Sequence, residues 1–196
     1  MNLFRLKHRG GNSRGFPYAH GYGKFQNYLP FLLGKELELR EQSWQVRPRP
    51  AGIITGDNGT KWGDLMECSY MPPSTFISER VLQSLCRMNG QVLTQTEFPI
   101  AEVKSKKLHG VPPPRYFAVQ WAGGIEVDWD ITGRERDAAG NLNPLVAKVS
   151  TWNGTDIFSW TNWDDTHLTM LCTEKIVELA EKEKWTNCEF KPVMTG

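Results

Sequence analysis

The residues with the clearest capacity for chemistry are three acidic side chains at alternate positions, Glu126, Asp128 and Asp130. Segment 125–131 alternates apolar and acidic residues, which predicts a half-solvated strand with the carboxylates on one face. Paired carboxylates can act as acid and base in glycoside hydrolysis, or bind a hard cation. A continuous acidic row is more typical of a solvated strand face, and such a face can also contact a basic partner.

A second candidate site is the aromatic and polar stretch 152–167, which contains three tryptophans. Tryptophans beside Asn and Asp suit a protein interface, because aromatic anchors carry much of the binding energy and polar groups set the register. We expect the contact residues here to be Trp160, Asn162, Trp163, Asp164 and Asp165. The earlier part of the stretch is better explained as scaffold, with Trp152 and Phe158 in the core and Asp156 holding a turn.

The rest of the chain lacks signatures of catalysis and metal binding. The four histidines share no ligand spacing, no Ser or Cys has a G-x-S-x-G context, and the glycines form no phosphate loop. The four cysteines include no C-x-x-C pair, so we expect free thiols, with Cys86 and Cys172 packed as small apolar side chains. The sequence therefore predicts a protein that is not an enzyme and has no metal and no cofactor.

Composition and charge limit the possible cellular compartments and the possible classes of partner. The 196 residues carry a net charge of +1, but residues 1–50 hold nine Lys/Arg against three Glu, and residues 151–196 hold four Lys against eight Asp/Glu. The basic segment contains no nucleic-acid-binding motif, so we expect no nucleic-acid partner. No apolar run approaches the roughly 18 residues of a membrane span, and no signal peptide is recognisable. We expect no membrane partner and a cytoplasmic location.

One local pattern occurs twice and must position these candidates. Residues 75–85 and 168–180 each read as a short apolar strand that leads into an amphipathic helix. Each helix starts with a hydroxyl residue able to accept a hydrogen bond from the first turn, followed by a Glu at the positive end of the helix dipole. The expected caps are Ser78 and Glu79 in the first copy, and Thr173 and Glu174 in the second.

These elements predict an α+β fold, a mixed or antiparallel sheet with two similar strand–cap–helix units packed on it. The clearest predicted break between structural elements is the proline run Val111-Pro112-Pro113-Pro114. It suggests an N-terminal lobe, 1–110, and a C-terminal lobe, 111–196, each holding one strand–helix unit. One continuous domain is the alternative.

Several short motifs, taken in their order along the chain, are similar to those of a known family. They are Leu-Phe-Arg-Leu at 3–6, Lys-Trp-Gly-Asp-Leu at 61–65, Phe-Ile-Ser-Glu-Arg at 76–80, Gly-Thr-Asp-Ile-Phe at 154–158, Thr-Glu-Lys at 173–175 and Trp-Thr-Asn-Cys-Glu-Phe-Lys-Pro at 185–192. Together they resemble the double-CXXCG family of bacterial immunity proteins and related immunity families of polymorphic toxin systems. The cysteine pairs that give the family its name are missing here, so the resemblance implies no metal.

The resemblance implies a cytoplasmic immunity protein that binds and neutralises a toxin delivered by a neighbouring bacterium. The partner would be the cognate toxin, encoded by an adjacent gene. The acidic row and the aromatic stretch are then the candidate toxin-binding residues.

Two other functions compete with this interpretation. In a carbohydrate-binding module, Trp121, Trp129, Trp160 and Trp163 would stack on sugar rings while Asp128, Asp130 or Asn162 bond the hydroxyls. In a hydrolase, Asp128 and Asp130 would supply the acid and the base.

Overall fold

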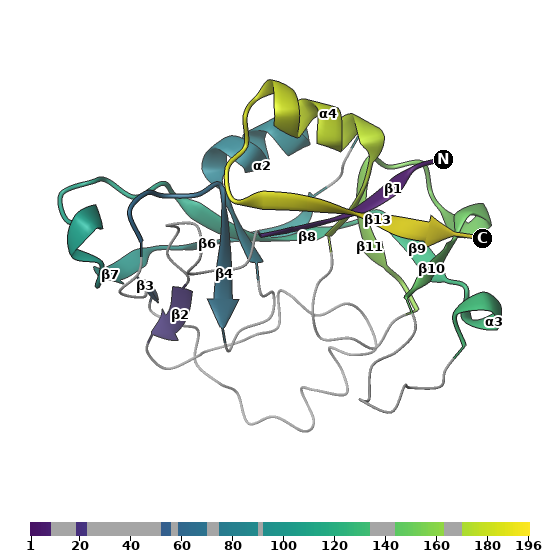
Figure 1. The fold of residues 1–196 in the computed structure, drawn as a ribbon, viewed down its shortest axis with the longest axis horizontal. Helices are drawn as coiled ribbons and strands as arrows, with labels where there is room; N and C mark the ends of the chain where they lie inside the picture. The colour runs from purple at the N-terminus through teal and green to yellow at the C-terminus, as the bar shows by residue number, and fades with distance from the viewer. Residues whose placement is uncertain are drawn as a thin grey trace.

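The chain forms a mixed α+β structure in which a closed six-stranded barrel adjoins a seven-stranded sheet. This computed structural model describes residues 1–8, 19–22, 52–55, 59–69, 75–89, 92–133, 144–162 and 170–196. Helices α2 (Glu79–Cys86) and α4 (Glu174–Lys182) lie together above the strands in Figure 1. Within the described ranges, no helix has the length and apolar character needed to cross a membrane.

The barrel combines the first strand of the chain with strands that follow residue 123. Its strands are β1 (Leu3–His8), β9 (Gly124–Val127), β10 (Val146–Lys148), β11 (Ile157–Trp160), β12 (Met170–Thr173) and β13 (Cys188–Thr195). They close in the order β1–β12–β11–β9–β10–β13. The β9–β11 and β10–β13 pairs are parallel, and the other neighbours are antiparallel. Leu3 lies opposite Val193, so the barrel joins residues from the two ends of the chain.

The interior of the barrel follows from the two-residue period of its strands. Phe158 and Trp160 of β11 and Leu171 of β12 belong to one buried cluster, whereas Ile157 and Cys172 belong to another. The first cluster fills the barrel, and also contains Leu3, Ile125, Val127 and Ala147. These barrel strands are therefore apolar on both faces, because the outer face of β11 and β12 is covered as well.

The seven-stranded sheet takes most of its strands from the middle of the chain. They are β2 (Ala19–Tyr22), β3 (Gly52–Thr55), β4 (Leu65–Ser69), β5 (Thr75–Ser78), β6 (Val92–Phe98), β7 (Ile100–Val103) and β8 (Tyr116–Trp121). The order is β6–β8–β5–β4–β2–β3–β7, with both parallel and antiparallel pairs. Edge strand β7 is followed by the short helix η3 (Lys106–Leu108).

A second buried cluster lies beneath α2 and α4 and joins the barrel to the sheet. Each helix presents an apolar stripe to it, with Val81 and Leu85 from α2 and Ile176 from α4 fully buried. Strand residues from both sheets complete the cluster, among them Ile77, Val119, Trp121, Ile157 and Cys172. Burying one large aliphatic side chain contributes about 1.5–3 kcal/mol. The two helices are thus held mainly by burial of the apolar side chains between them and the strands.

Several strands follow local apolar patterns in the sequence. Residues 3–6 lie in β1, residues 116–121 form β8, and residues 188–193 lie within β13. The closing strand matters for the site because it places Met194 on the outer surface of the barrel.

The strand predicted over 125–131 is wrong beyond Val127. Asp128 accepts a hydrogen bond from Ile131 N at 3.2 Å and caps the short helix α3 (Trp129–Thr132). Aspartate favours this role because its carboxylate satisfies an amide that the helix leaves unpaired. Asp128 and Asp130 therefore do not share a strand face with Glu126.

The expected packing of Cys86 is also wrong. Cys86 is exposed at the last position of α2, outside the apolar stripe of that helix. Cys172 is buried as predicted, and burial raises the pKa of its thiol. Both are free thiols, as is Cys188.

Candidate functional site

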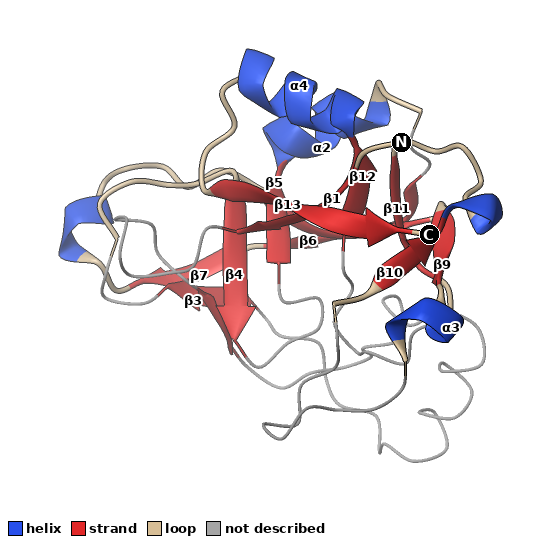
Figure 2. Cartoon of the chain, turned by 45° about the vertical axis from the view of Figure 1, so that its right-hand side comes forward, coloured by secondary structure: helices blue, strands red, loops and turns tan. Residues whose placement is uncertain are grey.

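Helix α3 fixes the carboxylate of Asp128 against the outside of the barrel. The Asp128 backbone N–H donates to Val146 O at 2.8 Å, and Val146 N in turn donates to Thr132 Oγ1 at 3.0 Å. These bonds tie both ends of the single helical turn to β10. Figure 2 shows α3 beside β9 and β10, near the end of β13.

Two large apolar side chains are exposed on this outer surface. Ile131 is 60% exposed and Met194 is 58% exposed. A Cβ on Gly196 would lie 2.6 Å from Ile131 Cδ1 and 3.3 Å from Val146 Cγ1, so Ile131 extends over the residue that follows β13. Residues two apart on an extended chain point the same way, so Met194 faces the same side as Gly196. Ile131 and Met194 therefore belong to one surface.

Carboxylates edge this apolar surface. Asp130 is exposed on α3, and Asp128 Oδ2 lies 3.4 Å from the position that a Cβ on Gly196 would occupy. We refer to Ile131, Met194, Asp128 and Asp130 as the barrel-end patch. Glu126 is half-buried and lies opposite Lys148 in the β9–β10 pair, so we leave it outside the patch. An exposed apolar surface with charged edges is typical of protein contact sites.

The structure buries one of the contact residues that the sequence predicts in the aromatic stretch. Trp160 is only 9% exposed, because β11 turns it into the barrel. Asn162 is exposed, but both ends of its amide are hydrogen-bonded within the chain. Its Oδ1 accepts from Val127 N at 2.7 Å and its Nδ2 donates to Val127 O at 3.1 Å. Asn162 thereby extends the edge of β9 next to Asp128. The predicted contacts Trp163, Asp164 and Asp165 lie outside the described residues.

Ile131 and Met194 were not predicted from the sequence. The signal for Met194 is the alternation of β13: Val193 packs against the barrel interior, so its neighbour must point outward. Ile131 carries no such signal, because its exposure depends on the start of α3 at Asp128.

A buried carboxylate, Asp64, joins three distant segments beneath the helices. It is 7% exposed and accepts hydrogen bonds from Ser78 Oγ at 2.9 Å and from Thr186 N at 2.7 Å. The Arg80 guanidinium adds a bidentate ion pair, with Nε at 3.1 Å from Oδ1 and Nη2 on Oδ2. Burial alone would raise the pKa of Asp64, but the hydrogen bonds from Arg80, Thr186 and Ser78 outweigh it and lower that pKa.

Asp156 makes a corresponding set of contacts beside α4. Its carboxylate accepts from Thr173 Oγ1 at 3.0 Å and pairs with Lys175 Nζ at 3.3 Å. In each case the aspartate carbonyl also accepts the N–H of the hydroxyl residue, at 2.7 Å from Ser78 to Asp64 and 3.0 Å from Thr173 to Asp156. The predicted helix cap at Thr173 is wrong, because its hydroxyl makes no bond to the first turn of α4. The hydroxyl donates to Asp156 but accepts no hydrogen bond from the helix.

Glu174 and Glu79 occupy the first turns of their helices, as the sequence predicts. Glu79 also accepts a hydrogen bond from Arg115 Nη1 at 2.5 Å, so it links α2 to the start of β8. These residues belong to the scaffold. Within the described part of the chain, no group of three or more His, Cys, Asp or Glu side chains is placed to hold a metal ion.

We compared the chain with models of protein families and with curated proteins, and no match was found in either comparison.

Proposed function

We propose that this chain is a bacterial immunity protein that neutralises a cognate toxin in the cytoplasm by stoichiometric binding. The observation that carries the proposal is the barrel-end patch, where Ile131 and Met194 are more than half exposed beside the exposed carboxylate of Asp130. Large apolar side chains at such exposure weaken a free protein's solubility and gain free energy when a partner covers them. Asp130 would then orient the partner.

The residues that carry the family resemblance support the same proposal. Asp64, Ser78, Arg80 and Thr186 come from three of the resembling motifs and meet in one buried network. Asp156, Thr173 and Lys175 come from two others and meet in the second. A resemblance confined to short motifs is what we expect when these motifs stabilise the scaffold and the segments between them vary with the partner.

We further propose that the two networks mark two similar strand–cap–helix units. In the β4–β5 pair Leu65 lies opposite Ile77, and in the β11–β12 pair Ile157 lies opposite Cys172. Each pair therefore sets an aspartate across from the hydroxyl residue that precedes the helix. The units differ at the cap, since only Ser78 accepts a hydrogen bond from its helix, at Val81 N.

The chemistry of the patch indicates what the toxin would offer. A partner that covers Ile131 and Met194 needs an apolar depression, and one that meets Asp128 and Asp130 needs Lys or Arg at its edge. Such opposite charges raise the association rate and select the partner more than they add affinity. The cognate toxin would be the product of a neighbouring gene.

The competing functions find less support in the geometry. Trp121 and Trp160 are 2% and 9% exposed, so two of the four tryptophans proposed to stack on sugars have their faces covered. The hydrolase requires Asp128 and Asp130 to converge on one substrate. Asp128 instead bonds Ile131 N at the start of α3.

Co-expression tests the proposal directly. The product of the gene next to this one is induced alone and together with this chain, and viable cells are counted. We expect the product to be lethal alone and harmless with the chain present, and the purified proteins to form an equimolar complex. A product that is harmless by itself, or equally lethal with the chain present, contradicts the proposal.

A further inference from the structure

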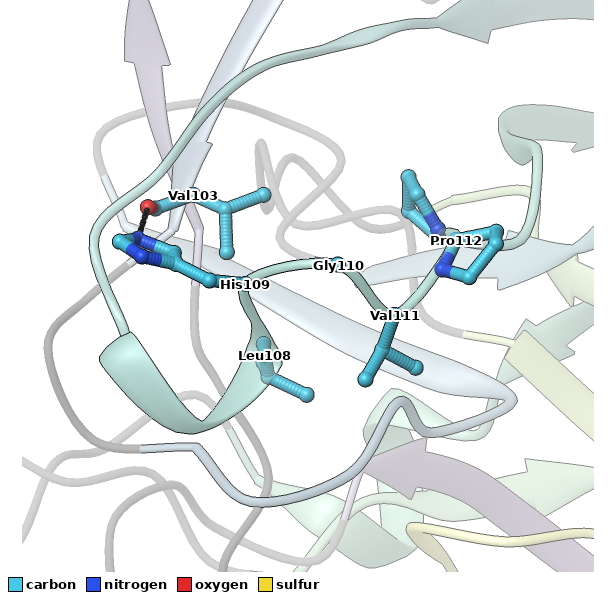
Figure 3. Close-up of a pocket in the computed structure, with 7 residues that line it drawn as sticks. Val103, Leu108, His109, Gly110, Val111 and Pro112 are labelled. Carbon is cyan, nitrogen blue, oxygen red and sulfur yellow. Dashed lines mark hydrogen bonds between the residues drawn. The ribbon is translucent and has the colours of Figure 1, made fainter.

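A pocket of about 410 Å³ opens beside edge strand β7, at the end of the seven-stranded sheet. Its walls are formed by Val103, Leu108, His109, Val111, Pro112 and Pro113. Figure 3 shows Val103 and His109 on one side of the loop and Pro112 on the other. None of these residues belongs to the barrel-end patch.

The loop that forms the pocket is held in place at several points. Leu108 is 1% exposed and anchors η3, while Trp62 Nε1 donates to Val111 O at 3.1 Å. His109 Nε2 lies 2.9 Å from Val103 O, which closes the loop on the end of β7. Two consecutive prolines, whose rings fix φ, form the remaining wall. A pocket built in advance costs little ordering free energy when a ligand binds.

Among the residues that the structure describes, the lining is apolar apart from the imidazole of His109. Val111 is 46% exposed although it is a large aliphatic side chain, and Pro112 and Pro113 beside it are also exposed. Pockets of several hundred Å³ with such walls accommodate apolar side chains or small molecules. The charged residues near the pocket indicate which of these two kinds of ligand it takes.

The chain next to the pocket wall is rich in lysine. Lys106 and Lys107 are exposed on η3, directly before two residues of the pocket wall, and Lys104 is exposed one residue after Val103. Glu102 is the single acidic residue between positions 100 and 114. Among the described residues, no ion pair engages Lys106 or Lys107. This loop therefore carries positive charge beside an open apolar hollow, and such charge attracts anions.

We infer that this pocket is a docking site for an acidic segment of a partner protein. An apolar side chain of the segment enters between Val111 and Val103, and neighbouring carboxylates meet Lys106 and Lys107. A protein segment fits better than a nucleic acid, because the described residues of the lining include no Phe, Tyr or Trp ring on which a base could stack. The inference does not rest on the proposed toxin binding, since the barrel-end patch is acidic and would take a partner of opposite charge.

The probe for this site is a short fluorescein-labelled peptide of alternating Asp and Glu with a central Leu-Trp pair, titrated into the full chain and followed by fluorescence anisotropy. We expect saturable binding that weakens as salt is added. Lys106→Glu combined with Lys107→Glu should weaken binding by about tenfold or more, and Val111→Asp by a similar factor. A peptide with Ser in place of Leu-Trp should bind more weakly than the parent peptide.

Lys182→Glu is the matched control, because it makes the same charge change at an exposed position on α4. Circular dichroism establishes that each variant is folded. If Val111→Asp does not fold, the lysine double variant decides the question alone. The inference is overturned if the peptide does not bind, if the double variant binds it as well as the control does, or if a single-stranded oligonucleotide displaces it from the pocket.

Discussion

The Ser78 hydroxyl serves two partners at once: it donates to Asp64 Oδ1 at 2.9 Å and accepts from Val81 N at 3.4 Å. One side chain thus caps α2 and fixes the buried carboxylate that also binds Arg80 and Thr186. Thr173, the residue in the corresponding position before α4, makes only the first of these bonds, to Asp156. The two helix starts should therefore differ in their sensitivity to mutation.

Removing the charge of Asp64 should destabilise the fold. Asp64→Asn keeps the shape of the side chain but leaves Arg80 without its anion and replaces one acceptor oxygen by an amide donor that faces another donor. We expect a loss of about 2–4 kcal/mol in the free energy of unfolding, since a charged hydrogen-bond network at a site 7% exposed is broken. Urea denaturation measures it. Glu178→Gln on the exposed face of α4 is the control, with an expected change within about 0.5 kcal/mol.

The lowered pKa of Asp64 predicts a specific pH dependence. A carboxyl whose folded-state pKa lies below its unfolded value of 3.8 stabilises the fold above that value and loses the contribution as the pH falls through the folded pKa. The difference in unfolding free energy between wild type and Asp64→Asn should be constant near neutral pH and shrink below about pH 4. Urea titrations across this range measure it. A difference that stays constant down to the acid transition would contradict the assigned network.

Ser78→Ala should cost more stability than Thr173→Ala. The first substitution removes a cap bond and a bond to Asp64, whereas the second removes the bond to Asp156 alone. We expect losses of about 1.5–3 kcal/mol and about 1 kcal/mol respectively. Thr173→Ser, which retains the hydroxyl, is the control and should recover most of its loss. Equal losses in both alanine variants would mean that the cap at Ser78 contributes nothing.

Much of the local structure could be predicted from sequence, but the closure of the barrel could not. Strand β8 is a continuous apolar run and α2 has a clear apolar stripe, so local patterns suffice for both. The β1–β13 pair, in contrast, joins Leu3 to Val193. No local pattern specifies a partner at that separation, because many strands of similar length compete for it.

The site was harder to predict, for two physical reasons. Trp160 has the polar neighbours of an exposed residue, yet the parallel pairing of β11 with β9 turns it into the barrel. Asp128 continues the alternation of a strand, yet its side chain caps a helix more favourably than it extends a sheet. The first outcome depends on a contact that forms only in the folded chain, and the second on a local hydrogen bond that competes with the strand pattern. The carboxylates were thus predicted with the wrong geometry.

A methyl group at Gly123 should disrupt the junction between β8 and the barrel. A Cβ there would lie 2.8 Å from Ile157 O and 2.9 Å from Phe158 Cβ, so backbone and core would both have to shift. We expect Gly123→Ala to destabilise the fold by about 2–4 kcal/mol, the cost of overpacking a tight interior. Thermal unfolding measures it, with Ala122→Ser at the exposed neighbouring position as the control. A melting temperature equal to that of the control would show that the segment around Gly123 can move away from β11.

The barrel-end patch predicts a separation of binding from stability. Met194 is 58% exposed, so Met194→Arg should leave the melting temperature nearly unchanged while it places a bulky cation where an apolar, basic-edged partner must dock. We expect affinity for the cognate toxin to fall by about tenfold or more, and Asp130→Lys to slow association most strongly at low salt. Glu181→Lys, the same charge reversal at an exposed position on α4, should change neither quantity. Affinity and association rate are measured by surface plasmon resonance with immobilised toxin. If Met194→Arg and Asp130→Lys still bind and protect cells as the control does, the toxin is bound by another face of the molecule.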